Sequence, residues 1–94
     1  MDKIRLSLAP IAGFSDRAFR TLCKECGADL VYTEMISAKA VVFGDKKTHA
    51  LADFAPVERP IILQVFGREP EDLSRAVALL YERCEPDGFD LNCG

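Results

Sequence analysis

Hydrophobic and polar positions along this chain repeat with two periods, one of two residues and one of helical spacing, and the two periods alternate from segment to segment. Period-two alternation and short apolar runs predict strands, and helical spacing predicts the segments between them. The predicted strands are residues 3–9, 29–34, 61–66 and 89–92. The run Ile61–Phe66 is apolar almost throughout, which is typical of a parallel strand buried on both faces.

Helices are predicted between these strands. The first has N-cap candidates in Ser15-Asp16, ends at Gly27 and presents one apolar face. That face consists of Ala18, Phe19, Leu22, Cys23 and Cys26. A second helical stretch over 36–51 is expected to break near Gly44, and a third helix starts at Pro70, a residue favoured in the first turn.

The resulting order is β-α-β-α-β-α-β, which predicts an α/β fold with a parallel sheet. An open doubly wound sheet and a closed (β/α)8 barrel both have this order. A complete TIM barrel needs about 250 residues, whereas this chain has 94. On the barrel interpretation, the chain is the N-terminal part of a (β/α)8 TIM barrel, about three and a half βα units.

Composition supports a folded domain and excludes several classes of protein. Hydrophobic residues make up 49% of the chain, which is enough to bury a core. The net charge of −3 gives no sign of an overall basic surface that would bind nucleic acid. No apolar stretch approaches the roughly 18 residues of a membrane span, and the start of the chain does not resemble a signal peptide. We therefore expect a cytoplasmic protein with no membrane contact, whose four cysteines are free thiols.

Two motifs with possible chemistry have simpler explanations. Cys23 and Cys26 form a C-x-x-C pair, but a second ligand pair at zinc spacing is missing, so no metal site is expected. The pair also lies at the carboxyl end of its helix, where the dipole does not activate a thiol, and buried core thiols are expected instead. His49, the only histidine, lies among polar residues and is expected to be solvated.

Polar side chains near the carboxyl ends of three predicted strands are more informative. Glu34 ends one strand, Gln64 interrupts an apolar run, and Asn92 closes the last strand. A buried amide without a partner costs about 1–3 kcal/mol, so Gln64 must bond to the protein or to a ligand. Each residue alone also fits a structural role, but three at equivalent strand ends favour the active site of a β/α barrel.

Four segments resemble motifs of the tRNA-dihydrouridine synthases, in the family's order and over nearly the whole chain. They are residues 8–20, 27–38, 64–67 and 87–94. The resemblance implies an FMN-dependent TIM barrel that reduces uridine in tRNA to 5,6-dihydrouridine with NADPH as reductant. It implies that residues 1–94 belong to the catalytic domain, and that the C-terminal half-barrel and a helical tRNA-binding domain lie outside them. This piece alone is then expected to be inactive.

The resemblance also carries residue roles. The residues expected to contact the cofactor are Pro10, Ile11 and Ala12 against the isoalloxazine ring, Gln64 at its polar edge, and Asn92. Asn92 is also expected near the flipped-out uracil, and Glu34 is a weaker candidate for substrate contact. The family's catalytic cysteine follows the position of Gly94, so no catalytic residue is expected within this chain. Cys93 is not given that role, because neighbouring strand-end positions point in different directions.

Two alternatives stay open, as does the oligomeric state. One is another FMN-dependent barrel oxidoreductase, similar to dihydroorotate dehydrogenases, which also carry a strand-end asparagine followed by Cys-Pro. The other is a non-catalytic half-barrel that assembles with another chain through its unpaired sheet edge.

Overall fold

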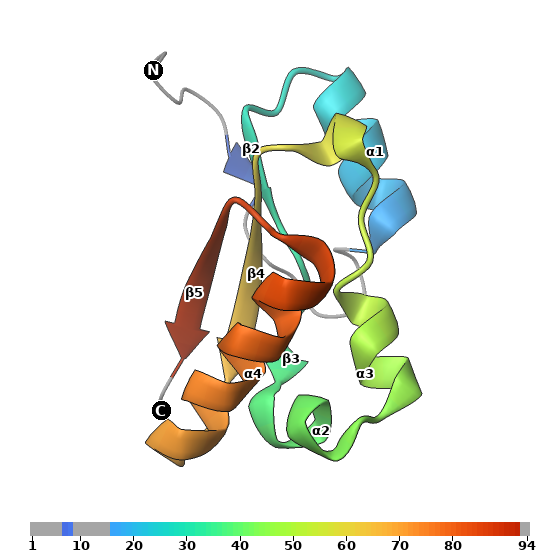
Figure 1. Ribbon diagram of the computed structural model, residues 1–94. Coiled ribbons are helices and arrows are strands. Elements are labelled where there is room, and N and C mark those ends of the chain that lie inside the picture. The colour runs from blue at the N-terminus through green and yellow to red at the C-terminus, as the bar shows by residue number, and fades with distance from the viewer. Residues whose placement is uncertain (1–6, 9–15, 93–94) are drawn as a thin grey trace.

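The computed structural model describes residues 7–8 and 16–92, and its elements follow the predicted order with one additional short strand (Figure 1). The strands are β1 Ser7–Leu8, β2 Leu30–Tyr32, β3 Ile36–Ser37, β4 Ile61–Phe66 and β5 Gly88–Asn92. The helices are α1 Arg17–Glu25, α2 Ala38–Phe43, α3 Lys46–Leu51, the short 3-10 helix η1 Pro56–Glu58 and α4 Pro70–Cys84. The predicted start of α4, the bounds of β4 and the break at Gly44 are confirmed.

Strand β4 is hydrogen-bonded on both of its edges, and every pairing in the sheet is parallel. β5 runs along one edge, while β2 and β3 share the other edge, β2 at its start and β3 at its end. β1 pairs with β2 on the outside. The strands therefore lie side by side in chain order, as in a (β/α)8 barrel, whereas a doubly wound sheet reverses its order at a switch point. The barrel interpretation of the fold is confirmed.

The second predicted strand, residues 29–34, is observed as β2, and an additional short strand, β3, follows it after a gap that Thr33 bridges. Its backbone N–H donates to the carbonyl of Ile62 at 3.0 Å, which continues the ladder past the end of β2. Its hydroxyl then accepts from the N–H of Gln64 at 3.1 Å and donates to the carbonyl of Glu34 at 2.9 Å. Ile36 and Ser37 pair with β4 rather than beginning a helix, so the helical stretch predicted from residue 36 starts at Ala38.

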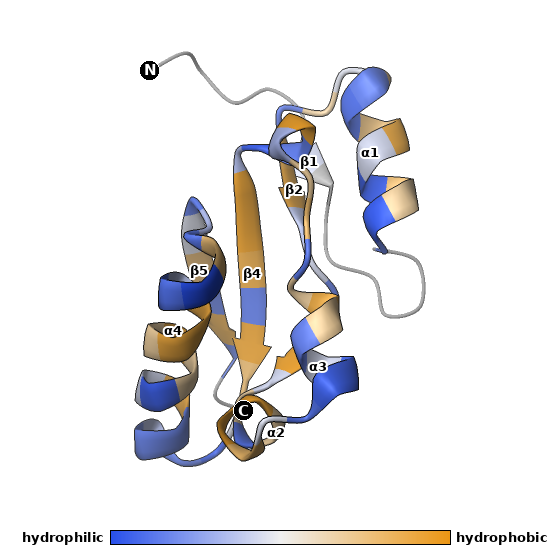
Figure 2. Ribbon diagram, turned by 45° about the vertical axis from the view of Figure 1, so that its right-hand side comes forward, coloured by the Kyte–Doolittle hydropathy of each residue, from blue (hydrophilic) through white to orange (hydrophobic). Residues whose placement is uncertain are grey.

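One face of the sheet carries the core. Ile61, Leu63 and Val65 alternate along β4 and are fully buried, and β4 is mostly hydrophobic in Figure 2. The cluster around Leu63 and Val65 includes buried residues of β3, α2 and α4, and the cluster around Ile61 includes residues of β2 and the loop before it. The other face of β4, with Ile62 and Phe66, is only half-buried in the described residues, so burial on both faces is not seen there.

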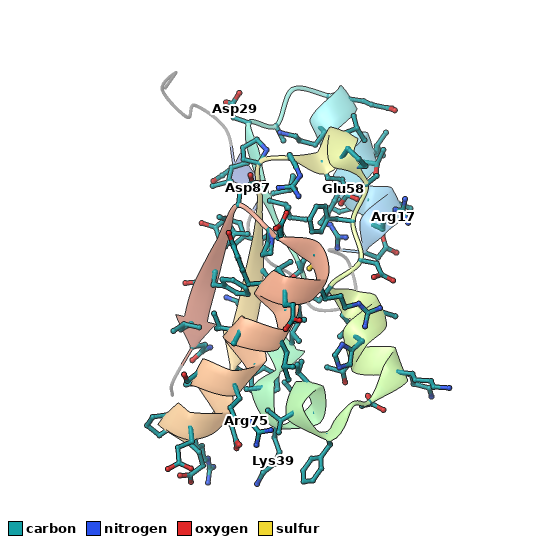
Figure 3. All side chains as sticks on the ribbon, in the orientation of Figure 1. Arg17, Asp29, Lys39, Glu58, Arg75 and Asp87 are labelled. Atoms are coloured by element: carbon teal, nitrogen blue, oxygen red, sulfur yellow. The ribbon has the colours of Figure 1, made fainter. Side chains whose placement is uncertain are left out.

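A buried ion pair holds α1 in place. The Arg20 Nε atom donates to Glu58 Oε1 at 2.6 Å, and both side chains are almost completely buried. The second oxygen of Glu58 accepts from the N–H of Ala55, and Arg20 also donates to the carbonyl of Asp53. Arg17 lies 3.9 Å from the same carboxylate, and Figure 3 shows these two side chains facing one another. Charged groups in the interior are tolerated when they are paired and hydrogen-bonded in this way.

The residues of the apolar face predicted for α1 are largely exposed rather than buried. Phe19 and Leu22 are 37% and 54% exposed, and Cys26 is also exposed, while Arg20 is the buried residue of the helix. Sequence periodicity alone favours burial of the apolar stripe. The ion pair with Glu58, which lies 38 positions away, sets the orientation instead.

Replacing Arg20 with Met is expected to cost roughly 3–5 kcal/mol of unfolding free energy, because it leaves the Glu58 carboxylate buried and unpaired. Urea unfolding of the complete gene product measures this loss. The matched control is Arg83→Ala, which removes an exposed ion pair with Asp53 and is expected to cost about 1 kcal/mol or less. Equal costs for the two substitutions would contradict the role given to the buried pair.

Candidate functional site

The strands β3, β4 and β5 end in register with one another. Their carboxyl ends form the carboxyl-terminal edge of the sheet, which is distinct from its two lateral edges. Phe66 of β4 pairs with Ser37 of β3 on one side and with Asn92 of β5 on the other. The N–H of Gly67 then donates to the carbonyl of Asn92 at 3.2 Å and extends this edge by one residue. In α/β barrels, active sites form at this edge.

A hollow of about 750 Å³ lies at this edge. It is lined by Met35, Ser37, Lys39, Phe66, Gly67, Arg68, Glu69, Asp72 and Asn92. Gly67 has a steric role in it, because a Cβ atom there would lie 3.2 Å from the Cβ of Ala38 at the start of α2. The glycine therefore lets the loop after β4 approach α2 closely, which sets the shape of the hollow.

Gln64 lies on the sheet face opposite the helices, and its partner is Asp90. The two residues are paired in register on β4 and β5, and Gln64 Nε2 donates to Asp90 Oδ2 at 2.9 Å. An ionised carboxylate only accepts hydrogen bonds, so Gln64 must turn its NH₂ group toward Asp90. The Oε1 atom of Gln64 is thereby directed elsewhere and can serve as an acceptor for another group.

Asp90 is a residue that sequence reasoning missed. A signal for it was present, because Asp90 and Asn92 are two positions apart on one strand and therefore share a face. Gln64 is half-buried rather than buried in the described residues, and the partner that its burial seemed to require is this carboxylate.

The structure brings Gln64 and Asn92 onto one face of neighbouring strands, but it does not bring Glu34 to them. Glu34 lies in the gap between β2 and β3 and lines a separate hollow of about 230 Å³ with residues of α1 and α3. The predicted cofactor contacts Pro10, Ile11 and Ala12 lie outside the described residues.

The histidine and one of the cysteines differ from expectation. His49 is half-buried rather than solvated, and its Nε2 atom lies 3.1 Å from the carbonyl of Val41, which makes this nitrogen a donor. Its Nδ1 atom is buried with no partner among the described residues. Cys26 is exposed and Cys23 is half-buried, so the prediction of two buried thiols is wrong for Cys26. Burial raises the pKa of the half-buried Cys84 thiol, which keeps it protonated.

Neither metal binding nor membrane crossing finds support in the residues that the structure describes. No three acidic, histidine or cysteine side chains among them are placed to hold a metal ion. None of the helices in this part of the chain has the length and apolar character needed to span a bilayer.

Residues 7–94 match the sequence profile of a family described as dihydrouridine synthase. A probable tRNA-dihydrouridine synthase of Aquifex aeolicus is 44% identical over 87 residues, which cover 93% of this chain and 27% of that protein. The corresponding protein of Treponema pallidum is 36% identical over 86 residues, covering 92% and 25%. A tRNA-dihydrouridine(20/20a) synthase of Xylella fastidiosa strain Temecula1 is 38% identical over 91 residues, covering 96% and 26%. The chain thus spans about a quarter of the length of these relatives.

Thr33→Val is expected to loosen β4 at Gln64, because the partly buried Gln64 N–H loses its acceptor. An unsatisfied buried donor costs about 1–3 kcal/mol. Native-state hydrogen exchange of the Gln64 amide in the complete gene product measures the effect as faster exchange. Thr21→Val serves as the control, since the Thr21 hydroxyl donates to a carbonyl within its own helix. An unchanged exchange rate at Gln64 would show that Thr33 does not bridge the strands.

Proposed function

The chain belongs to the dihydrouridine synthase family, and we propose that it forms the N-terminal part of the flavin-binding domain of a tRNA-dihydrouridine synthase. The rest of the barrel and a helical tRNA-binding domain would lie in the remainder of such a protein. The proposed reaction is the NADPH-driven reduction of uridine to 5,6-dihydrouridine in tRNA, in the cytoplasm. The observation that carries the proposal is the polar face formed by Gln64, Asp90 and Asn92 where parallel strands in chain order end.

The side chains on this face fit the polar edge of FMN. The pyrimidine edge of a flavin presents an N–H between two carbonyl oxygens, and an amide can match such a pattern with one acceptor and one donor. Because Asp90 engages one N–H of Gln64, the Gln64 side chain retains its Oε1 acceptor and a second N–H. We assign Gln64 and Asn92 to this edge of the cofactor. Pro10, Ile11 and Ala12 are assigned to the ring on the family resemblance alone.

Each candidate site residue then has one limited role. The chemistry that FMN supplies when bound is hydride transfer to the C5–C6 bond of uracil. Gln64 would hold the cofactor's polar edge in one orientation, and Asp90 would hold Gln64. Asn92 would offer its amide to the cofactor and to a uracil turned out of the RNA stack. The general acid is expected outside residues 1–94, and Glu34, which lines a separate hollow, stays a weaker candidate for substrate contact.

The two alternatives have less support. Three relatives from different bacteria carry names that specify tRNA-dihydrouridine synthesis, which favours that substrate over a dihydroorotate-type substrate. A non-catalytic half-barrel would have no reason to keep a carboxylate and two amides together on an open sheet face, where they add little to stability.

The direct test is to incubate the complete gene product with unmodified tRNA, FMN and NADPH and to digest the RNA for mass spectrometry. We expect uridine to be converted to dihydrouridine, and we expect no conversion when NADPH is left out. Reduction of a free pyrimidine with no change in any tRNA would favour the dehydrogenase-like alternative. A protein that binds no flavin at all would favour the non-catalytic half-barrel.

Asp90→Ala is expected to weaken FMN binding, although Asp90 itself need not touch the cofactor, because Gln64 then loses its single orientation. A hydrogen bond contributes about 0.5–1.5 kcal/mol net, so the Kd should rise roughly twofold to tenfold. Fluorescence titration of the apoprotein with FMN measures the change. Leu91→Ala is the matched control, since Leu91 is half-exposed and lies on the other face of the same strand. FMN binding by Asp90→Ala at wild-type affinity would contradict the positioning role.

A further inference from the structure

The described cations fall into two groups, those with partners and those without. Arg17, Arg20, Arg59 and Arg83 form ion pairs, and Lys24 donates to a backbone carbonyl. Within residues 16–92 the cationic side chains that make neither an ion pair nor a hydrogen bond are Lys39, Lys46, Lys47, Arg68 and Arg75. The cations of the first group therefore bind groups within the chain, whereas those of the second group can bind an external anion.

The cations without partners lie toward the end of the molecule that carries the candidate site. They belong to α2, α3, the loop after β4 and the first half of α4. Lys39 and Arg68 line the hollow together with Asn92. Figure 3 shows Lys39 and Arg75 at the lower end of the molecule, away from Asp29 and Asp87 at the upper end.

The three lysines among them occupy positions that disfavour a cation. Lys39 is the second residue of α2, and Lys46 and Lys47 are the first two residues of α3. A positive charge in the first turn opposes the helix dipole, and α2 has no acid in its first turn or at its N-cap, Ser37, to offset it. At α3 the N-cap Asp45 is the one acid beside the two lysines. Lys39 breaks this local folding rule with no acid at the start of its helix, and such residues often serve function instead.

An exposed aromatic side chain lies among these lysines. Phe43, the last residue of α2, is 80% exposed. It lies four residues after Lys39, which places both on one face of the helix. Gly44, with φ of 79°, turns the chain directly into α3 and its two lysines. Aromatic and basic side chains interleaved in this way are typical of surfaces that bind nucleic acid, where bases stack on the ring.

The charge of this segment differs from that of the whole chain. Residues 38–51 contain three lysines and one acid, Asp45, whereas the chain has 12 basic and 15 acidic residues. The Asp45 carboxylate is engaged by the hydroxyl and N–H of Thr48, and these bonds, with a smaller effect of Lys47, lower its pKa. Arg68 and Arg75 flank the acidic first turn of α4, Glu71 and Asp72, along the chain, so we leave those two arginines out of the proposed surface. Asp72 also lines the hollow to which Lys39 belongs.

We propose that Lys39, Phe43, Lys46 and Lys47, here called the α2–α3 ridge, contact the RNA backbone beside the hollow. The proposal rests on the proposed function, which brings a uridine of tRNA to this edge of the sheet. A base turned out of its stack leaves its flanking phosphates at the rim of the site, and Lys39 belongs both to that rim and to the ridge. The lysines neutralise phosphates, and Phe43 stacks on a neighbouring base.

The first test is the double charge reversal Lys46→Glu with Lys47→Glu in the complete gene product. Acidic residues favour the first turn of α3, so the melting temperature should stay the same or rise, and FMN should bind as before. The affinity for unmodified tRNA, measured by fluorescence anisotropy at 50 mM salt, should fall roughly tenfold or more. Arg83→Glu is the control, because it reverses a charge at the far end of α4 and should leave tRNA affinity unchanged.

The second test separates charge from stacking. Lys46→Ala with Lys47→Ala should reduce the slope of log affinity against log salt by about two, if each lysine neutralises one phosphate. Phe43→Ala should lower tRNA affinity by about fivefold or more at unchanged salt slope. Tyr81→Ala, which removes another exposed aromatic ring from α4, is the matched control.

The outcomes distinguish this inference from the proposed function. Weaker tRNA binding in ridge variants that keep their FMN and their melting temperature supports the ridge. Variants that bind tRNA with wild-type affinity and salt slope, while the wild type makes dihydrouridine, overturn the ridge and leave the function standing. A wild-type protein that binds FMN but no tRNA overturns both.

Discussion

The candidate site depends on the pairing of β4 with a neighbour on each of its edges. Parallel pairing in register fixes which side chains meet across the strands, so that Gln64 lies beside Asp90 and Phe66 beside Asn92. Because side chains alternate, the same register sends Leu63 and Val65 into the core against α2 and α4. A shift of one residue would turn the amide toward the core and the apolar side chains toward the open face.

Much of this arrangement could be predicted from the sequence. Helical spacing, the proline at the start of α4 and the apolar run of β4 all predicted their elements, since each signal is local. The buried Arg20 could not be predicted in that way, because its partner Glu58 is far along the chain and the ion pair overrides the apolar stripe of α1. The gap between β2 and β3 could not be predicted either, because there the Thr33 hydroxyl, rather than a backbone carbonyl, accepts from the N–H of Gln64.

The sequence selected residues near strand ends, and the structure shows which of these residues lie together. Strand-end position identified Gln64 and Asn92, and these residues do share a face. It also selected Glu34, which the gap between β2 and β3 turns toward a different hollow. The spacing of Asp90 from Asn92 placed it on the same face, but only the register of β4 with β5 reveals that its carboxylate accepts from the Gln64 amide. The lysines of α2 and α3 became informative only when the structure placed them in first turns, where they form no ion pair or hydrogen bond among the described residues.

The central claim is that the polar face of β4 and β5 holds the flavin through an amide oriented by Asp90. The measurement that tests it most directly is a crystal structure of the complete gene product with FMN. The account predicts the flavin's polar edge within hydrogen-bond distance of the Gln64 side chain, about 2.7–3.2 Å, with Gln64 Nε2 still donating to Asp90. A flavin bound away from Gln64, or a Gln64 amide that has left Asp90, would contradict it.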